Sequence, residues 1–204
     1  MSHLLFATRS TGKQREIREI LADFPYKVLF PDDVGLPEDP TEIGIETEST
    51  FEGNALRKAE YFHRKSRLPT VGEDAGLEVF SLGGAPGVRS KRFALATINQ
   101  DQANNGELLR RLSGAPAERR RAQYRCAAVL VLGGGRVPHT FEGSCPGRIL
   151  MEPQGTGGFG YDPLFFSEEL QMSFGDAPPE KKHAVSHRGK AIRSLAEWLR
   201  IHPL

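Results

Sequence analysis

Six consecutive residues near the start of the chain combine hydroxyls, a glycine and basic groups, a mixture suited to binding phosphate. They follow an apolar run over residues 3–7, and residues at helical spacing come after them, so a turn between a strand and a helix N-terminus is predicted. Unpaired N–H groups at such an end attract anions. The Walker A pattern does not fit, because it needs Gly at Ala7 and Ser or Thr at Gln14. An ordinary strand-to-helix turn is the alternative. The six are Thr8, Arg9, Ser10, Thr11, Gly12 and Lys13.

A pair of acids, Glu73 and Asp74, stands beside Gly76, and further carboxylates occur at Glu46 and Glu48. Hard carboxylate oxygens suit Mg²⁺, which commonly uses one or two of them together with water and substrate phosphates. The pair therefore indicates a metal or acid–base site, and a solvated acidic turn is the alternative.

Two aromatic residues, Phe159 and Tyr161, lie in a glycine-rich loop over residues 155–163. Such a loop lets a ring approach a flat ligand closely, and stacking on a base contributes about 1 to 3 kcal/mol. A tight loop whose aromatics fill the core is the alternative interpretation.

A basic segment over residues 181–189 contains Lys182, His187 and Arg188, which can donate hydrogen bonds to oxygen on a base or a phosphate. A solvated basic turn is the alternative. No Ser/His/Asp triad or Cys/His pair is evident by motif, and Cys145, which is followed by Pro and Gly, is expected to pack rather than attack.

The elements that must position these residues alternate between strands and helices. Strands are predicted over 3–7, 26–30, 122–132 and 137–145, and 69–80 is expected to form two strand segments meeting at the acidic turn. A mobile surface loop is expected over 31–49. Helices are predicted after Lys13, from a Thr50 cap to about Ser66, from an Asp101 cap through Leu112, and from about Ser186. This alternation indicates an α/β or mixed α+β fold.

The composition limits the function classes. A chain of 204 residues with 27 basic and 26 acidic side chains has a net charge of +1, so a single domain over 1–204 is expected and a nucleic-acid coat is not. The longest apolar run, 126–132, is too short to span a membrane. The short apolar N-terminal segment does not resemble a signal peptide, and two cysteines form no disulfide framework, so a cytoplasmic location is expected.

All four constellations, in this order, resemble the Ham1-like family of inosine/xanthosine triphosphate pyrophosphatases. Residues 7–13 resemble the family's A-T-G-N-x-G-K, 50–59 its T-F-x-E-N-A-x-x-K-A, and 72–77 with 82–87 its A-D-D-S-G-L and L-G-G-x-P-G. Residues 155–165 resemble G-T-G-G-F-G-Y-D-P-x-F, and 184–189 resemble A-x-S-H-R-G. Arg9 and Ser10 replace the family's Gly-Asn, Glu73 its first Asp, and Ala75 the following Ser.

The resemblance implies a Mg²⁺-dependent hydrolase that converts ITP, dITP and XTP to monophosphate and pyrophosphate. It implies a homodimer with a central mixed sheet and two lobes around a deep nucleotide-binding cleft. Asp74 takes the place of the catalytic carboxylate, and Asp74 and Glu46 that of the metal-associated acids. The substrate-binding positions that it implies are Thr8, Arg9, Ser10, Thr11, Gly12, Lys13, Lys58, Ala75, Arg92, Phe159, Gly160, Tyr161, Asp162, Lys182, His187 and Arg188.

Base choice follows from hydrogen-bond polarity, because hypoxanthine and xanthine present an oxygen where adenine presents an amino group. Donors such as Lys182, His187 and Arg188 would therefore reject adenine. Two further hypotheses are a nucleotide-binding protein without turnover and a house-cleaning pyrophosphatase of broadened specificity. Measured turnover on a panel of nucleotides distinguishes these two hypotheses from a pyrophosphatase specific for ITP, dITP and XTP.

Overall fold

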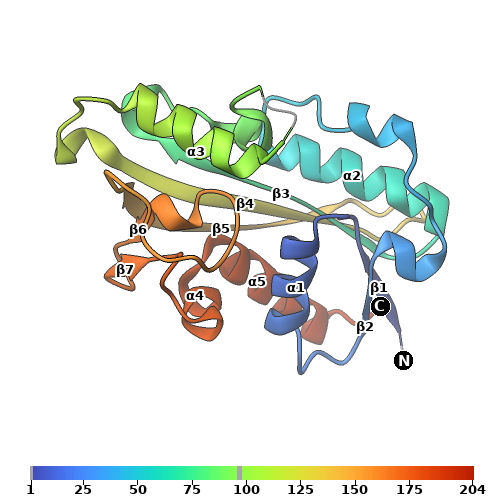
Figure 1. Cartoon of the computed structure of the whole chain (residues 1–204). Helices are drawn as coiled ribbons and strands as arrows, with labels where there is room; N and C mark the ends of the chain where they lie inside the picture. The colour runs from blue at the N-terminus through green and yellow to red at the C-terminus, as the bar shows by residue number, and fades with distance from the viewer. Residues whose placement is uncertain (1, 96–97) are drawn as a thin grey trace. The chain divides into compact units, whose positions relative to one another are not determined.

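The strands form one mixed sheet in the computed structural model, which describes residues 2–95 and 98–204. Within these residues the order is β2-β1-β3-β4-β5-β6-β7 (Figure 1). β1 runs parallel to β2 and β3, whereas β6 is antiparallel to β5 and β7. Together with the flanking helices, this confirms the predicted α/β class. The strands are β1 (His3–Phe6), β2 (Lys27–Leu29), β3 (Thr70–Val79), β4 (Arg121–Val131), β5 (His139–Ile149), β6 (Phe165–Ser167) and β7 (Met172–Ser173).

The chain divides into two compact units, each assembled from separate stretches of sequence. Unit 1 comprises Met1–Asp74, Cys126–Glu142 and Lys190–Leu204, and unit 2 comprises Ala75–Arg125 and Gly143–Gly189. β3, β4 and β5 each contribute residues to both units. A single domain over 1–204 and a deep cleft stay predictions.

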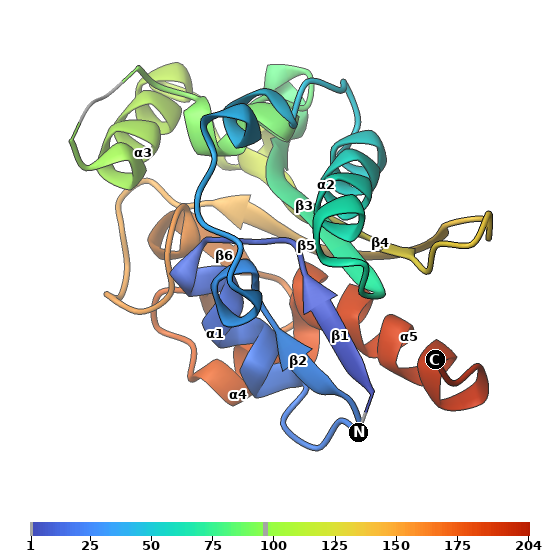
Figure 2. The same ribbon diagram turned by 90° about the vertical axis from the view of Figure 1, so that its right-hand side faces the viewer.

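Unit 1 surrounds the parallel strands with helices on both faces. The helix α2 (Phe51–Ser66) covers one face of β1, and α1 (Thr11–Ile20) and most of α5 (His187–Ile201) lie on the opposite face (Figure 1). Figure 2 shows β1 beside β2. Leu4, Leu5 and Phe6 are fully buried, as expected for a strand covered on both sides. The continuous apolar run in the sequence is therefore the centre of this unit.

Unit 2 has its own core, to which the sheet and one helix contribute. Leu77 of β3, Tyr124 of β4 and Phe165 of β6 pack in one cluster with Leu108 of α3 (Gln100–Arg111) and with Phe174. A short helix, α4 (Pro179–Val185), completes this unit. None of the helices in the described residues is long and apolar enough to cross a membrane.

Two predictions about local structure were wrong. Residues 70–79 form one continuous strand, so Glu73 and Asp74 lie within β3 and not at a turn. α3 is preceded by Asn99 in the left-handed conformation, and Asp101, predicted as its cap, lies inside the helix. The basic segment predicted at the start of the last helix is divided between α4 and the first residues of α5.

The 31–49 segment, predicted as a mobile loop without regular structure, contains two short 3₁₀ helices, Pro31–Val34 and Pro40–Gly44. Proline begins each of these 3₁₀ helices and an acidic side chain occurs in each first turn, an arrangement typical of helix starts.

The predicted Thr50 cap of α2 is confirmed, because the Thr50 hydroxyl accepts a hydrogen bond from the Gly53 N–H at 3.0 Å.

The close approach of β3 to α2 in unit 1 depends on Gly72. A Cβ added there would overlap the Ala55 carbonyl of α2 and lie 2.7 Å from the Ala59 N. We expect Gly72→Ala to lower the free energy of unfolding by about 1 to 3 kcal/mol or more, because the helix backbone must move away from β3.

Chemical denaturation of the Gly72→Ala variant measures this cost. Gly106→Ala is the matched control, since Gly106 lies inside α3 with no heavy atom near its added Cβ. This control should gain about 0.5 to 1 kcal/mol from helix propensity. Equal midpoints for the two variants would show that the strand and the helix are not in tight contact.

Candidate active site

Side-chain hydrogen bonds within the turn between β1 and α1 fix its conformation. The Ser10 hydroxyl accepts a hydrogen bond from the Lys13 N–H at 3.5 Å and caps α1. The Ser10 N–H donates to the Thr8 hydroxyl at 3.2 Å, and the Gln14 amide donates to the Thr8 carbonyl at 3.1 Å. The turn therefore has a fixed shape in front of a helix N-terminus, which is the arrangement that binds anions.

Lys13 connects this turn to β3. Its ammonium group lies 2.8 Å from a carboxylate oxygen of Glu73, whose side chain is 1% exposed. The Cys126 thiol of β4 donates to the other Glu73 oxygen at 3.3 Å. A carboxylate buried this deeply requires such partners, because its charge has lost the solvation of water. Glu73 thus orients Lys13 beside the turn.

Lys58 of α2 is the centre of a buried charge cluster in unit 1. Its ammonium donates to Glu46 at 2.7 Å and to the Glu73 carbonyl at 2.5 Å, and it lies 3.8 Å from Asp74. The Asn54 amide, one helical turn earlier, donates to the other Asp74 oxygen at 3.1 Å. Each Asp74 oxygen therefore has a defined neighbour, and both neighbours, Asn54 and Lys58, belong to α2.

Burial and charge act against each other in this cluster. Burial raises the pKa of Asp74, and the nearby Glu46 adds to the rise, while Lys58, Lys13 and the Asn54 hydrogen bond oppose it. For Lys58, burial alone would lower the pKa, but Asp74, Glu46 and Glu73 outweigh it and the pKa is raised. The lysine therefore stays charged, and Asp74 is a stronger base than an exposed aspartate.

Glu46 and Asp74 suit a divalent cation by the chemistry of their donors. Both present carboxylate oxygens to the same ammonium group, so they lie near each other. No group of three or more His, Cys, Asp or Glu side chains that could hold a metal ion occurs in the described part of the chain. Mg²⁺ needs only one or two carboxylates when water and phosphate complete its shell, so the pair fits Mg²⁺.

The glycine loop in unit 2 is organised by carboxylates and an amide. Asp162, which is 2% exposed, accepts the Phe159 N–H at 2.8 Å and the Lys182 ammonium at 2.6 Å. The Gly160 N–H donates to Asp101 at 2.8 Å, and the Gly160 carbonyl accepts from Asn105 at 3.0 Å. These contacts fix the conformation of the loop.

The two aromatics of this loop have different environments. Tyr161 is buried and donates its hydroxyl to the Ser90 carbonyl at 2.8 Å, and burial followed by the charge of Asp101 raises the pKa of its phenol. Tyr161 therefore supports the loop from the core. Phe159 is half-buried, and the Lys182 and Arg188 cations lie 5.3 and 5.6 Å from its ring centroid. Only Phe159 presents its ring beside the basic residues.

The basic residues predicted to face a base are buried, which contradicts the solvated-turn alternative. Lys182 of α4 and His187 and Arg188 of α5 are each less than 5% exposed. The His187 ring stacks on Tyr124 of β4, with centroids 4.5 Å apart and an interplanar angle of 6°. Stacking fixes the plane of the imidazole, so its nitrogens have a defined direction.

The predicted site residues separate by chemistry into the two units. Unit 1 holds the phosphate turn, Lys58 and the acids Glu46 and Asp74, whereas unit 2 holds the glycine loop and Lys182, His187 and Arg188. Ala75 and Arg92 also fall in unit 2, where Ala75 follows Asp74 in β3 and Arg92 is exposed at the end of the 3₁₀ helix Gly87–Arg92.

Sequence reasoning did not identify several supporting residues, namely Asn54, Asp101, Asn105 and Tyr124. Asn54 could have been found, because it precedes Lys58 by four positions and so shares its helix face. The others carry no local signal, since each reaches its partner from a distant part of the sequence.

Comparisons with known proteins agree over almost the whole length. A sequence model of the Ham1 family matches residues 4–198. A dITP/XTP pyrophosphatase of Geobacter sulfurreducens is 43% identical over 203 residues, 98% of this chain and 97% of the relative. One of Desulforamulus reducens is 42% identical over 197 residues, 96% and 94% of the two chains.

Solved structures give the same result. A HAM1 protein from Coxiella burnetii has a TM-score of 0.86 at 32% identity and covers 98% of this chain and 100% of its own. A nucleoside-triphosphatase, dITP/XTP pyrophosphatase, from Mycobacterium abscessus has a TM-score of 0.73 at 36% identity, with coverage of 99% and 100%.

The buried cluster leads to a prediction about stability and pH. Lys58→Met removes the cation that contacts both Glu46 and Asp74 and leaves Asp74 with the charge of Lys13, so we expect a loss of about 3 to 5 kcal/mol in unfolding free energy at neutral pH. The variant's Asp74 pKa should rise further above its unfolded value. That penalty is absent below the unfolded pKa, grows as pH rises from the unfolded to the folded pKa, and is fully present above the folded pKa.

Urea denaturation at several pH values tests this expectation, and the difference between the wild type and the variant should shrink toward acid pH. Lys65→Met is the control, because Lys65 makes an ion pair of similar length with Asp39 at an exposed position and should cost far less. A deficit independent of pH would show that lost packing, rather than lost charge, causes the destabilisation.

Proposed function

Because the chain belongs to the Ham1 family, we propose that it hydrolyses the non-canonical purine nucleoside triphosphates dITP, XTP and ITP to the monophosphate and pyrophosphate. The observation that carries the proposal is the buried cluster in which Lys58, Glu46 and Asp74 meet in the same unit as the phosphate-binding turn. The relatives, which are dITP/XTP pyrophosphatases, support the reaction and the substrate class.

The phosphates are assigned to unit 1. The N–H groups at the start of α1, with Lys13 and Lys58, supply positive charge to a triphosphate that carries about four negative charges. A chain whose net charge is only +1 must concentrate its cations for this purpose. The Glu73 contact supports the role of Lys13, because it holds the ammonium beside the turn.

Asp74 is assigned the role of general base. Water attacks the α-phosphorus, the bond from that phosphorus to the bridging oxygen breaks, pyrophosphate leaves, and Asp74 accepts the proton of the water. Burial supports this role by raising the Asp74 pKa, and Asn54 and Lys58 orient the carboxylate. Mg²⁺, held by Glu46 and Asp74 when bound, would neutralise phosphate charge and stabilise the leaving oxygens.

The base is assigned to unit 2. Phe159 offers a ring for stacking, and Lys182, His187 and Arg188 offer donors to an oxygen at the six position. An adenine amino group facing these donors would leave both sides without a hydrogen bond, at about 1 to 3 kcal/mol for each buried group. The homodimer and the cytoplasmic location are further proposals that the family resemblance supports.

A nucleotide panel tests the proposed substrate class. We expect pyrophosphate release from dITP, ITP and XTP to exceed release from ATP by at least about tenfold in kcat/KM, the equivalent of one mismatched buried hydrogen bond. The assay separates pyrophosphate from orthophosphate and is run with and without Mg²⁺. Equal rates on ATP and ITP would contradict the specificity, and orthophosphate alone would contradict the reaction.

The role of Asp74 has its own test. Asp74→Asn retains an oxygen that can accept the Asn54 hydrogen bond, so the fold should persist while the rate falls by about two orders of magnitude or more. Single-turnover hydrolysis of dITP measures the rate, and circular dichroism checks the fold. The exposed Asp23→Asn change serves as the control. Near-normal turnover of the Asp74 variant would place the base elsewhere.

A further inference from the structure

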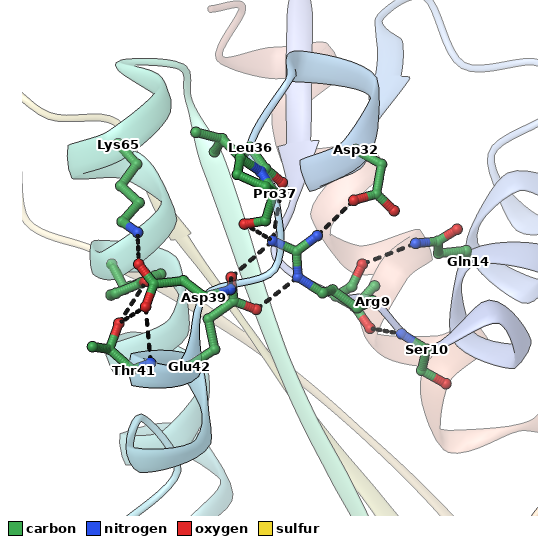
Figure 3. A network of polar contacts seen from close by, with 12 residues as sticks. Arg9, Ser10, Gln14, Asp32, Leu36, Pro37, Asp39, Thr41, Glu42 and Lys65 are labelled. Atoms are coloured by element: carbon green, nitrogen blue, oxygen red, sulfur yellow. Dashed lines mark hydrogen bonds and ion pairs between the residues drawn. The ribbon is translucent and has the colours of Figure 1, made fainter.

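Arg9, expected from the sequence to contact substrate, directs its guanidinium at the 31–49 segment instead. Figure 3 shows all three of its nitrogens donating to acceptors of this segment. Nε and Nη2 form a two-pronged contact with Glu42 at 2.7 Å each, and Nη1 lies 2.6 Å from Asp32. Nη2 also reaches the Leu36 and Pro37 carbonyls at 3.0 and 2.9 Å.

The contact with Glu42 is the strongest part of this arrangement. The side chains of Arg9 and Glu42 are 18% and 14% exposed, whereas that of Asp32 is 73% exposed. Phe62 of α2 lies beneath the guanidinium, with its ring centroid 5.8 Å from Cζ. A planar two-pronged contact shielded from water is stronger than an exposed ion pair, so Glu42 rather than Asp32 fixes Arg9.

The residues around Glu42 are fixed from a second side, by α2. The Asp39 carboxylate accepts hydrogen bonds from the Thr41 N–H at 2.9 Å and from Lys65 at 2.8 Å. The Thr41 and Tyr61 hydroxyls are 3.0 Å apart. Figure 3 shows Arg9 and Lys65 reaching this short 3₁₀ turn from separate elements. The turn is thus held between the phosphate loop and α2.

Glu46 follows this turn closely in the chain. Glu46 lies four positions after Glu42, a span of at most about 14 Å for an extended chain, and the 3₁₀ helix shortens it. Beyond it, the Glu48 N–H donates to Asn54 at 2.9 Å. Glu46 therefore projects toward Lys58 from a short bridge anchored at both ends. Loss of the Arg9–Glu42 contact would leave the turn held by its α2 contacts, and Glu46 would be held less firmly beside Asp74.

We propose that Arg9 is a positioning residue that clasps the 31–49 segment to the phosphate-binding turn and so holds Glu46 beside Asp74. The inference rests on the proposed function, in which Glu46 and Asp74 hold the metal. It assigns Arg9 a role different from direct phosphate binding. Contact with phosphate would require the guanidinium to leave Glu42 and Asp32. The two-pronged contact with Glu42 also explains why an arginine suits this position, since a lysine cannot donate two parallel hydrogen bonds to one carboxylate.

Hydrogen exchange on the protein without nucleotide or metal tests the clasp independently of turnover. Arg9→Met and Glu42→Gln should each speed exchange of the amides of residues 36–48 by about tenfold or more, the effect of losing a charge-assisted hydrogen bond. The double variant should exchange no faster than Arg9→Met, because both changes remove the same contact. Arg9→Lys should not restore protection.

Arg18→Met is the matched control, because Arg18 makes a longer, exposed contact of 3.4 Å with Asp33 in the same segment. It should leave exchange over residues 36–48 within about twofold of the wild type. Unchanged amide exchange over residues 36–48 in both Arg9→Met and Glu42→Gln would overturn the proposal, whether or not the protein hydrolyses nucleotides.

Steady-state kinetics distinguish a clasp from a phosphate ligand. The clasp predicts that Arg9→Met and Glu42→Gln raise the Mg²⁺ concentration for half-maximal rate by a similar factor of several-fold, with no further rise in the double variant. A direct phosphate ligand predicts that Arg9→Met raises KM while Glu42→Gln, which frees the guanidinium, leaves KM unchanged or lowers it. That second pattern would overturn the proposal.

Discussion

Charge buried beside β3 is the constraint on which the structure of unit 1 depends. Asp74 and Glu73 are 6% and 1% exposed, and carboxylates buried to this extent require nearby positive charge or hydrogen-bond donors. Lys58 and Lys13 supply that charge from α2 and α1. The close packing of α2 against Gly72 brings Lys58 to β3, so a contact between backbones sets the electrostatics of the site.

The same arrangement explains how a base and a cation can coexist. If Asp74 were more exposed, its pKa would lie in the ordinary range and its carboxylate would be a weak base. If it were buried without Lys58 and Asn54, it would take up a proton and lose its charge. Partial compensation leaves the pKa of Asp74 raised while fixing the direction of both oxygens. Positioning and basicity therefore arise from the same neighbours.

The proposed roles in nucleotide hydrolysis fall on residues of different units. Unit 1 contains the turn, cations and acids that we assign to phosphate and metal, and unit 2 contains the ring and donors that we assign to the base. Each set is fixed by contacts within its own unit: Glu73 holds Lys13, and Asp162 holds both Lys182 and the backbone at Phe159. Each proposed role thus has its own group of supporting residues.

The α/β class and the Thr50 cap of α2 could be predicted from the sequence, because apolar periodicity and helix caps are local properties. The sequence pattern misplaced Glu73 and Asp74 at a turn, since glycine and charged residues normally interrupt a strand, and here Gly72 is required by the approach of α2. Which charges meet depends on tertiary contacts. Arg9 lies in a phosphate-binding turn by sequence, yet its partner is Glu42, 33 residues away, and no local pattern encodes that contact. The interactions that set the pKa of Asp74 and the direction of the Arg9 guanidinium come from folding, which brings distant charges together where water cannot screen them.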